Sequence, residues 1–199
     1  MKIFLTSDTH GSITKALKVL EHLSDIDLII HCGDYASDGQ WLSDITGIPA
    51  VSVHGNSDQR DLSDFTTVDT PYGKILVIHG HMQLVEFRLD NLLYFAMEKD
   101  CVAACYGHTH IAAYEEIDGI HLINPGSLSD PRDGTSGTFA LITCSEDDFY
   151  ADIVRYDTFM ASHKKAGPPA DSSSGTQKKN APKAKGGFLR KLLNYSDRF

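Results

Sequence analysis

Side chains that bind metal ions recur in five short blocks within the first 110 residues. The blocks are Asp8-Thr9-His10, Gly33-Asp34, Gly55-Asn56-Ser57-Asp58, His79-Gly80-His81 and Gly107-His108-Thr109-His110. Carboxylate, imidazole and amide groups without a thiolate suit Mn, Fe, Co, Ni or Zn in a reactive site better than a structural zinc. One block alone would be weak, because Asp and Gly are common in turns. Five blocks in succession indicate a metal centre.

Seven side chains in these blocks are candidate ligands, enough for two ions if one carboxylate is shared. They are Asp8, His10, Asp34, Asn56, His79, His108 and His110. The charge of two divalent ions would exceed that of Asp8 and Asp34, which leaves a site suited to an anionic phosphate. Without metal, the two carboxylates would repel such a substrate.

Each block follows an apolar run that predicts a strand. Strands are expected at 2–7, 27–32, 50–54, 74–79, 102–106, 120–123, 138–143 and 149–155, with helices at 14–23 and 84–100. The carboxyl ends of parallel strands share one edge of a sheet, so the blocks are expected to converge there. Alternating strands and helices with a strand-rich end predict a layered α/β domain that is partly antiparallel late in the chain.

Composition and charge divide the chain into an acidic body and a basic end. The 199 residues are 41% hydrophobic and 23% charged, enough for one domain with a packed core. Residues 1–160 hold 9 Lys and Arg against 25 Asp and Glu, whereas residues 161–199 hold 9 against 2. The acidic body argues against a nucleic-acid partner.

The basic end is expected to have two parts. Residues 161–187 are rich in Ser, Gly, Pro and Lys and are expected to form a disordered basic linker. Residues 188–199 regain apolar side chains as a short amphipathic segment suited to an anionic membrane surface or a groove on a protein. A solubilising tail without a partner is the alternative.

Other features indicate a cytoplasmic protein. No run of 18 apolar residues predicts a transmembrane helix, and the N-terminal apolar run is too short for a secretory signal. The four cysteines show no disulfide or CxxC spacing. Cys32 is expected to point into the core, away from Asp34, and Cys101 and Cys105 are expected to be buried.

Taken together, the blocks resemble the calcineurin-like metallophosphoesterase superfamily. Its pattern is DxH, GDxx, GN followed by an acidic residue, His, and GHxH, and all five stand here in order. The small size and the later Asn124-Pro125-Gly126-Ser127 resemble its compact prokaryotic phosphodiesterase branch. The resemblance covers about residues 1–157 and implies a four-layer α/β/β/α sandwich with mixed sheets.

The resemblance also implies how the ligands divide. One ion would take Asp8, His10, Asp34 and His110, and the other Asp34, Asn56, His79 and His108, with Asp34 bridging. The implied reaction is hydrolysis of a small phosphodiester by a two-metal-activated hydroxide. Mn is the expected ion, with Ni, Co, Fe or Zn as alternatives. A non-catalytic scaffold that recruits protein partners is the alternative function, and a nuclease is a third.

Catalytic and substrate roles fall on fewer residues. Asp34 and Asn56 are expected to take part in catalysis. Many family members carry His where this chain has Ser57, so His81 is the nearest candidate to protonate a leaving group, and a loop histidine is an equal alternative. Substrate contacts are expected from Asn56, Asp58 and Arg60, with turn capping and a solvated charge as the alternatives for the last two.

Two smaller groups of residues lie outside the blocks. Asn124 and Ser127 are expected in a turn at the rim of the site. His22, His31, His54, His121 and His163 fit no motif and are expected to be structural or exposed.

Overall fold

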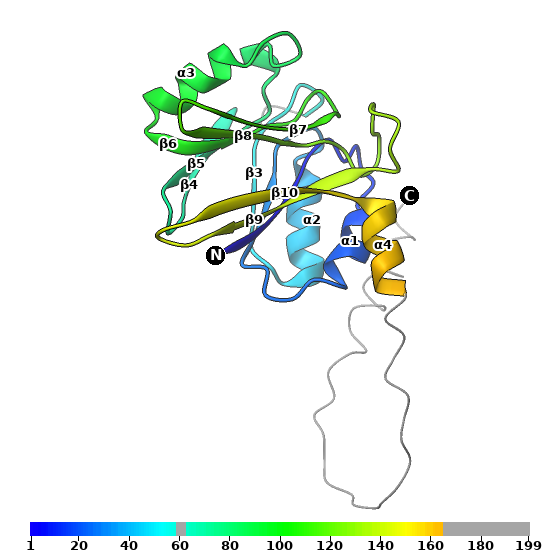
Figure 1. Ribbon diagram of the computed structural model, residues 1–199. Helices are drawn as coiled ribbons and strands as arrows, with labels where there is room; N and C mark the ends of the chain where they lie inside the picture. Colours follow the sequence, from blue (N-terminus) through cyan, green and yellow to red (C-terminus); the bar gives the residue numbers. More distant parts are fainter. Residues whose placement is uncertain (59–62, 165–199) are drawn as a thin grey trace, which may run out of the picture.

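Two β-sheets lie face to face, with helices on their outer sides (Figure 1). The computed structural model describes residues 1–58 and 63–164. The first sheet has the order β10-β9-β1-β2-β3, in which β1, β2 and β3 are parallel. β9 is antiparallel to both of its neighbours, β1 and β10. The strands of this sheet are β1 (Lys2–Thr6), β2 (Leu28–His31), β3 (Ala50–Ser52), β9 (Thr138–Cys144) and β10 (Phe149–Arg155).

The second sheet has the order β4-β5-β6-β8-β7, with three parallel strands between two antiparallel edges. Its strands are β4 (Phe65–Asp69), β5 (Lys74–Ile78), β6 (Cys101–Cys105), β7 (Ala112–Ile117) and β8 (Ile120–Pro125). The helices are α1 (Thr14–Leu20), α2 (Ser37–Thr46), α3 (Asp90–Glu98) and α4 (Tyr156–Lys164), with a short 3₁₀ turn η1 (His81–Gln83).

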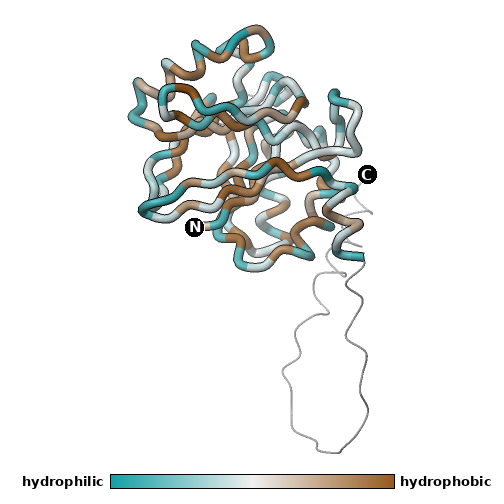
Figure 2. The backbone as a smooth tube through the Cα atoms, in the orientation of Figure 1, coloured by the Kyte–Doolittle hydropathy of each residue, from teal (hydrophilic) through white to brown (hydrophobic). Residues whose placement is uncertain are grey.

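Successive side chains of a strand point to opposite faces of its sheet, and this alternation builds the four layers. On β1, Ile3 and Leu5 join a cluster between the sheets with Ile75 and Val77 of β5, whereas Phe4 joins the cluster under α1, α2 and α4. A third cluster fills the space between α3 and the second sheet. Figure 2 shows the matching pattern, with hydrophobic residues along the strands and hydrophilic residues on many turns. Burial of these three apolar layers drives the fold, and the expected α/β/β/α sandwich is confirmed.

Several elements differ from the expectations. The helix expected at 84–100 is shorter, because Leu84 has a left-handed backbone (φ 57°) and α3 begins only at Asp90. α4 continues past the expected boundary at residue 160, and its buried Phe159 packs on Phe139 at 5.4 Å between ring centroids. Residues 161–164, expected to begin the disordered linker, belong to α4 instead, and residues 165–187, the C-terminal segment and Arg60 lie outside the described residues.

Across the described ranges, no helix combines the length and hydrophobicity that crossing a membrane requires. All four cysteines are buried free thiols, and Cys32 lies between the sheets as expected.

Candidate metal centre

The five blocks meet where the parallel strands of both sheets end. They follow β1, β2, β3, β5 and β6, and backbone hydrogen bonds join four of them in two pairs: the Asp8 N–H donates to Gly33 O at 3.0 Å, and the Gly107 N–H donates to His79 O at 3.0 Å. Close packing of the loops requires glycine at 55, because a Cβ there would lie 2.3 Å from the backbone nitrogen of Asp34.

The ligand loops turn sharply as they leave the strands. Five of the seven expected ligands have a positive φ, a conformation that Asp and His adopt more readily than most residues. They are Asp8, His10, Asp34, His108 and His110. Such strained positions gather at functional sites, where the surrounding structure holds them in place.

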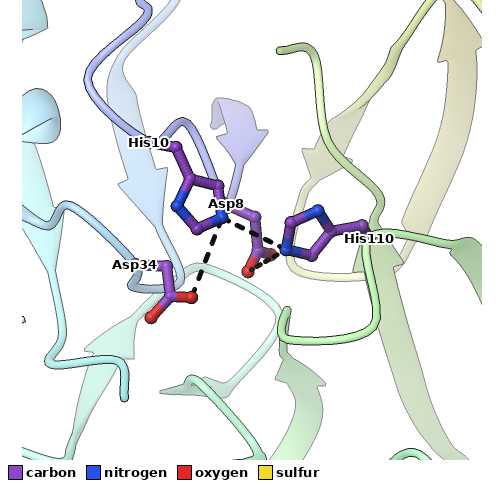
Figure 3. Close-up of side chains that lie close together, drawn as sticks. All are labelled: Asp8, His10, Asp34 and His110. Atoms are coloured by element: carbon purple, nitrogen blue, oxygen red, sulfur yellow. Dashed lines mark hydrogen bonds and ion pairs between the residues drawn. The ribbon is translucent and has the colours of Figure 1, made fainter. Parts of the chain in front are cut away.

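Four of the expected ligands form a first cluster, shown in Figure 3. Asp8, His10, Asp34 and His110 each offer one atom, and these atoms lie within 4.8 Å of one another. His10 Nε2 lies 3.2 Å from His110 Nε2 and 3.9 Å from Asp34 Oδ2, and His110 Nε2 lies 3.4 Å from Asp8 Oδ1. Two imidazoles and two carboxylates therefore converge on one small volume.

The other three expected ligands form a second cluster beside it. Asn56 Oδ1 lies 3.1 Å from His79 Nε2 and 3.0 Å from His108 Nδ1. His79 Nε2 is also 3.4 Å from Asp34 Oδ1. Asp34 therefore presents Oδ2 toward the first cluster and Oδ1 toward the second.

Neighbouring groups orient three of the histidine rings. His79 Nδ1–H donates to Cys32 O at 2.7 Å, and His110 Nδ1–H donates to Asp130 O at 2.6 Å. Both rings therefore keep Nε2 as a lone-pair donor aimed into the clusters. His108 is reversed, with Nδ1 in the cluster and Nε2 lying 3.5 Å from Glu86 Oε2. Nothing in the sequence singled out Glu86 or Asp130, since neither belongs to a block.

A buried chain of hydrogen bonds lies beneath the first block. The Gly33 N–H donates to His31 Nδ1 at 3.2 Å, so Nε2 carries the ring proton and donates to Thr9 Oγ1 at 2.8 Å. Thr9 Oγ1 then donates to Asp38 Oδ2 at 2.5 Å. Burial, together with the charge of His79, lowers the pKa of His31 to about 3, which keeps the ring neutral. His31 fitted no motif, yet it helps fix the loop between two ligands.

Asn124 and Ser127 support the loops from below. Asn124 Nδ2 donates to Gly107 O at 2.9 Å, and Ser127 Oγ donates to Asp8 O at 2.8 Å. Both side chains are fully buried. They hold the ligand loops and do not reach the rim of the site, so the expected rim position was wrong.

Ser57 and Asp58 also act within the protein. Ser57 donates its N–H to Asp34 Oδ1 at 2.8 Å and its hydroxyl to Asp34 Oδ2 at 3.0 Å. Asp58 accepts hydrogen bonds from the Ala36 N–H at 2.8 Å and the Gly55 N–H at 2.9 Å. These contacts match the turn-capping alternative for Asp58, and they give Ser57 a role that sequence analysis missed.

The carboxylates of Asp8 and Asp34 have opposite pKa shifts. Burial, with the nearby charge of Asp34, raises the pKa of Asp8 to about 7. Burial acts in the same direction on Asp34, but His79 and the hydrogen bonds from Ser57 outweigh it and lower the pKa of Asp34. Burial lowers the pKa of His79 to about 4, so its ring is neutral and able to bind a metal ion.

The residues present fit divalent cations. Within the described residues, Asp8 Oδ1 is buried without a hydrogen-bond partner, and it faces His110 Nε2 at 3.4 Å and His79 Nε2 at 4.0 Å. A buried polar atom with no partner is costly, and a cation between these atoms would satisfy it. The donor set of oxygen and imidazole nitrogen, without sulfur, suits first-row divalent ions.

Comparison with known proteins agrees with this geometry. Residues 1–147 match the calcineurin-like phosphoesterase superfamily domain. The chain belongs to this superfamily. It is 34% identical over 154 residues to "Probable metallophosphoesterase YsnB" of Bacillus subtilis, a match covering 74% of this chain and 86% of that protein.

Two further comparisons extend the likeness. Over 146 residues the chain is 32% identical to "Phosphodiesterase MJ0936" of Methanocaldococcus jannaschii, covering 63% of this chain and 83% of that one. The fold resembles the crystal structure of a conserved uncharacterized protein from Streptococcus pneumoniae, with a TM-score of 0.66, 25% identity, and coverage of 78% of this chain and 90% of that chain. Membership supports a metal-dependent phosphoesterase.

Proposed function

We propose that this protein is a phosphodiesterase that uses two divalent ions to hydrolyse a small phosphodiester. The observation that carries the proposal is the position of Asp34, which presents one carboxylate oxygen to each of two ligand clusters. Asp8, His10 and His110 would complete the first site, and Asn56, His79 and His108 the second. Mn is the proposed ion.

When bound, two such ions supply Lewis acidity and lower the pKa of water toward neutrality. The chain's own residues then position the substrate. Asn56 turns Oδ1 toward His79 and His108, which leaves its amide N–H groups to donate to a phosphoryl oxygen. Ser57 holds Asp34 in the orientation in which its two oxygens face different clusters.

Within the described part of the chain, the site offers only His81 as a candidate to protonate the leaving group. His81 lies 5.4 Å from His79 and 6.1 Å from His108, measured between ring centroids. Burial and the nearby His108 and His54 lower the pKa of His81 from that of an ordinary histidine, which reduces the protonated fraction available to a leaving group. We therefore propose fast hydrolysis only for diesters with good leaving groups, such as nitrophenolate.

The test is metal reconstitution of the purified protein. We expect two equivalents of Mn per chain by elemental analysis, and hydrolysis of bis(p-nitrophenyl) phosphate that chelation abolishes and Mn restores. Asp34→Ala should lose both ions and activity, whereas the control Asp152→Asn, at an exposed position on β10, should keep both. Two bound ions without hydrolysis of any phosphoester would instead favour the scaffold alternative.

A further inference from the structure

A cavity adjoins the metal centre at His81. Its volume is about 180 Å³, and it is formed by the start of β4, the end of β5, η1 and α3. Its lining residues are Asp64, Phe65, Ile78, Gly80, His81, Met82, Gln83 and Phe95. His81 connects the two sites, because it lines this cavity and its ring lies 5.4 Å from the ring of the expected ligand His79.

The walls of the cavity suit a ring or a short alkyl group. Phe65 and Phe95 meet edge to face, with ring centroids 4.9 Å apart, and Ile78 and Met82 add aliphatic surface. The volume is well below the roughly 300–1,000 Å³ of sites for drug-sized ligands, so a whole nucleotide would not fit.

The polar groups of the cavity define the charge that it accepts. Asp64 contributes a carboxylate, which would repel an anionic group. Lys99, whose Nζ lies 5.4 Å and 5.2 Å from the ring centroids of Phe65 and Phe95, is paired with Glu98 at 3.1 Å. In the part of the chain that the structure describes, His81 Nδ1 and Gln83 Oε1 are buried without hydrogen-bond partners. Gln83 Oε1 and the Asp64 carboxylate are acceptors, so a hydroxyl, amine or ammonium group on the ligand would complement them.

We propose that this cavity binds the organic substituent on one ester oxygen of the substrate. This substituent derives from a small, mainly apolar alcohol and is neutral or cationic. The assignment rests on the proposed phosphodiesterase function, because the reacting phosphate would sit at the metal centre next to His81. It excludes substrates whose ester group carries a second phosphate or a carboxylate at this position.

The binding test uses three probes with one shared ring: benzyl alcohol, benzylamine and benzoate. Amide NMR of the full chain, with and without chelator, should show shifts at Gly80 and Gln83 with the amine and the alcohol, and weaker shifts with benzoate. Asp64→Asn should remove this discrimination against benzoate. Equal binding of all three probes to the parent protein, or no shifts at these amides, would overturn the proposal.

Two methionines provide a matched pair of variants. Met82 lines the cavity and is 64% exposed, and Met97 on α3 is 42% exposed and lies outside it, so neither substitution threatens the core. Met82→Ala should weaken benzylamine binding about threefold, from lost apolar contact, and Met97→Ala should not change it. An equal effect of both variants would contradict the assignment.

The kinetic test separates this proposal from the proposed function. Met82→Ala should raise the KM for bis(p-nitrophenyl) phosphate about threefold, with kcat and metal content unchanged. Ring binding without any change in KM would mean that the cavity is not a substrate subsite. A protein that binds the rings with the predicted charge preference but hydrolyses nothing would refute only the phosphodiesterase function.

Discussion

Asp8→Asn should stabilise the metal-free fold increasingly as the pH rises. Burial and the charge of Asp34 raise the pKa of Asp8 to about 7, from 3.8 for an ordinary Asp. Between these values, the folded chain keeps a proton that the unfolded chain releases. The contribution of Asp8 to stability is therefore fully present below pH 3.8 and is lost as the pH rises through 7.

The size of the effect follows from the pKa difference. About three pKa units, at about 1.4 kcal/mol each, give a change of roughly 4 kcal/mol in the stability difference between variant and parent. Asparagine does not ionise, and its side-chain oxygen can still accept the hydrogen bond that Asp8 Oδ2 receives from the His108 N–H at 3.0 Å. Groups that do not interact with Asp8 titrate alike in both proteins and cancel in the difference.

The assay is urea unfolding in chelator, followed by circular dichroism at intervals from pH 4 to pH 8. The free energy of unfolding of the variant minus that of the parent should increase across this range. With excess Mn at pH 8, the order should reverse, because the variant has lost a metal ligand. A flat difference for Asp8→Asn would refute the inferred burial of an ionising carboxylate.

Three further substitutions test the supports of the clusters. Ser57→Ala removes a hydrogen bond to Asp34 and should lower Mn affinity about tenfold by calorimetry; unchanged affinity would count against this role. Thr9→Val leaves His31 Nε2–H without its acceptor and should lower the free energy of unfolding by roughly 2–3 kcal/mol. A loss below about 0.5 kcal/mol would contradict the buried series of hydrogen bonds from Gly33 to Asp38. Glu86→Ala should weaken binding of the second Mn about tenfold, and Glu86→Gln should weaken it less. Equal losses of affinity in the two variants would argue against a role of Glu86 in orienting His108.

The arrangement of the ligands could be predicted because it depends on local patterns. Each block follows a buried apolar run, and parallel strands bring their carboxyl ends to one edge. That reasoning brought Asp8 and His110 together across about 100 residues. The two edge strands of the second sheet, β4 and β7, were not predicted, because β4 has one buried residue, Val68, and β7 has none, so neither carries a clear periodic pattern.

Contacts between loops could not be predicted. Asp38 lies in α2, and its partner Thr9 lies 29 residues earlier in a different loop. The glycine of this helix also has a tertiary cause: a Cβ at Gly39 would lie 2.1 Å from Ser52 Oγ. Gly39 weakens the local pattern of a helix, so α2 became visible only once its packing on β3 was known.

The same burial that makes Asp8 unfavourable as a free anion suits it to a metal ion. An ionised carboxylate away from water is costly unless a cation is beside it. Asp8 has no Lys or Arg ion-pair partner among the described residues, and its Oδ1 faces two histidine nitrogens instead. Binding of a cation would therefore displace the proton from Asp8 and, at the same time, stabilise the fold. Metal affinity and fold stability are coupled through this one buried side chain, so the difference between the parent and Asp8→Asn in either quantity, followed against pH, should report the ionisation of Asp8.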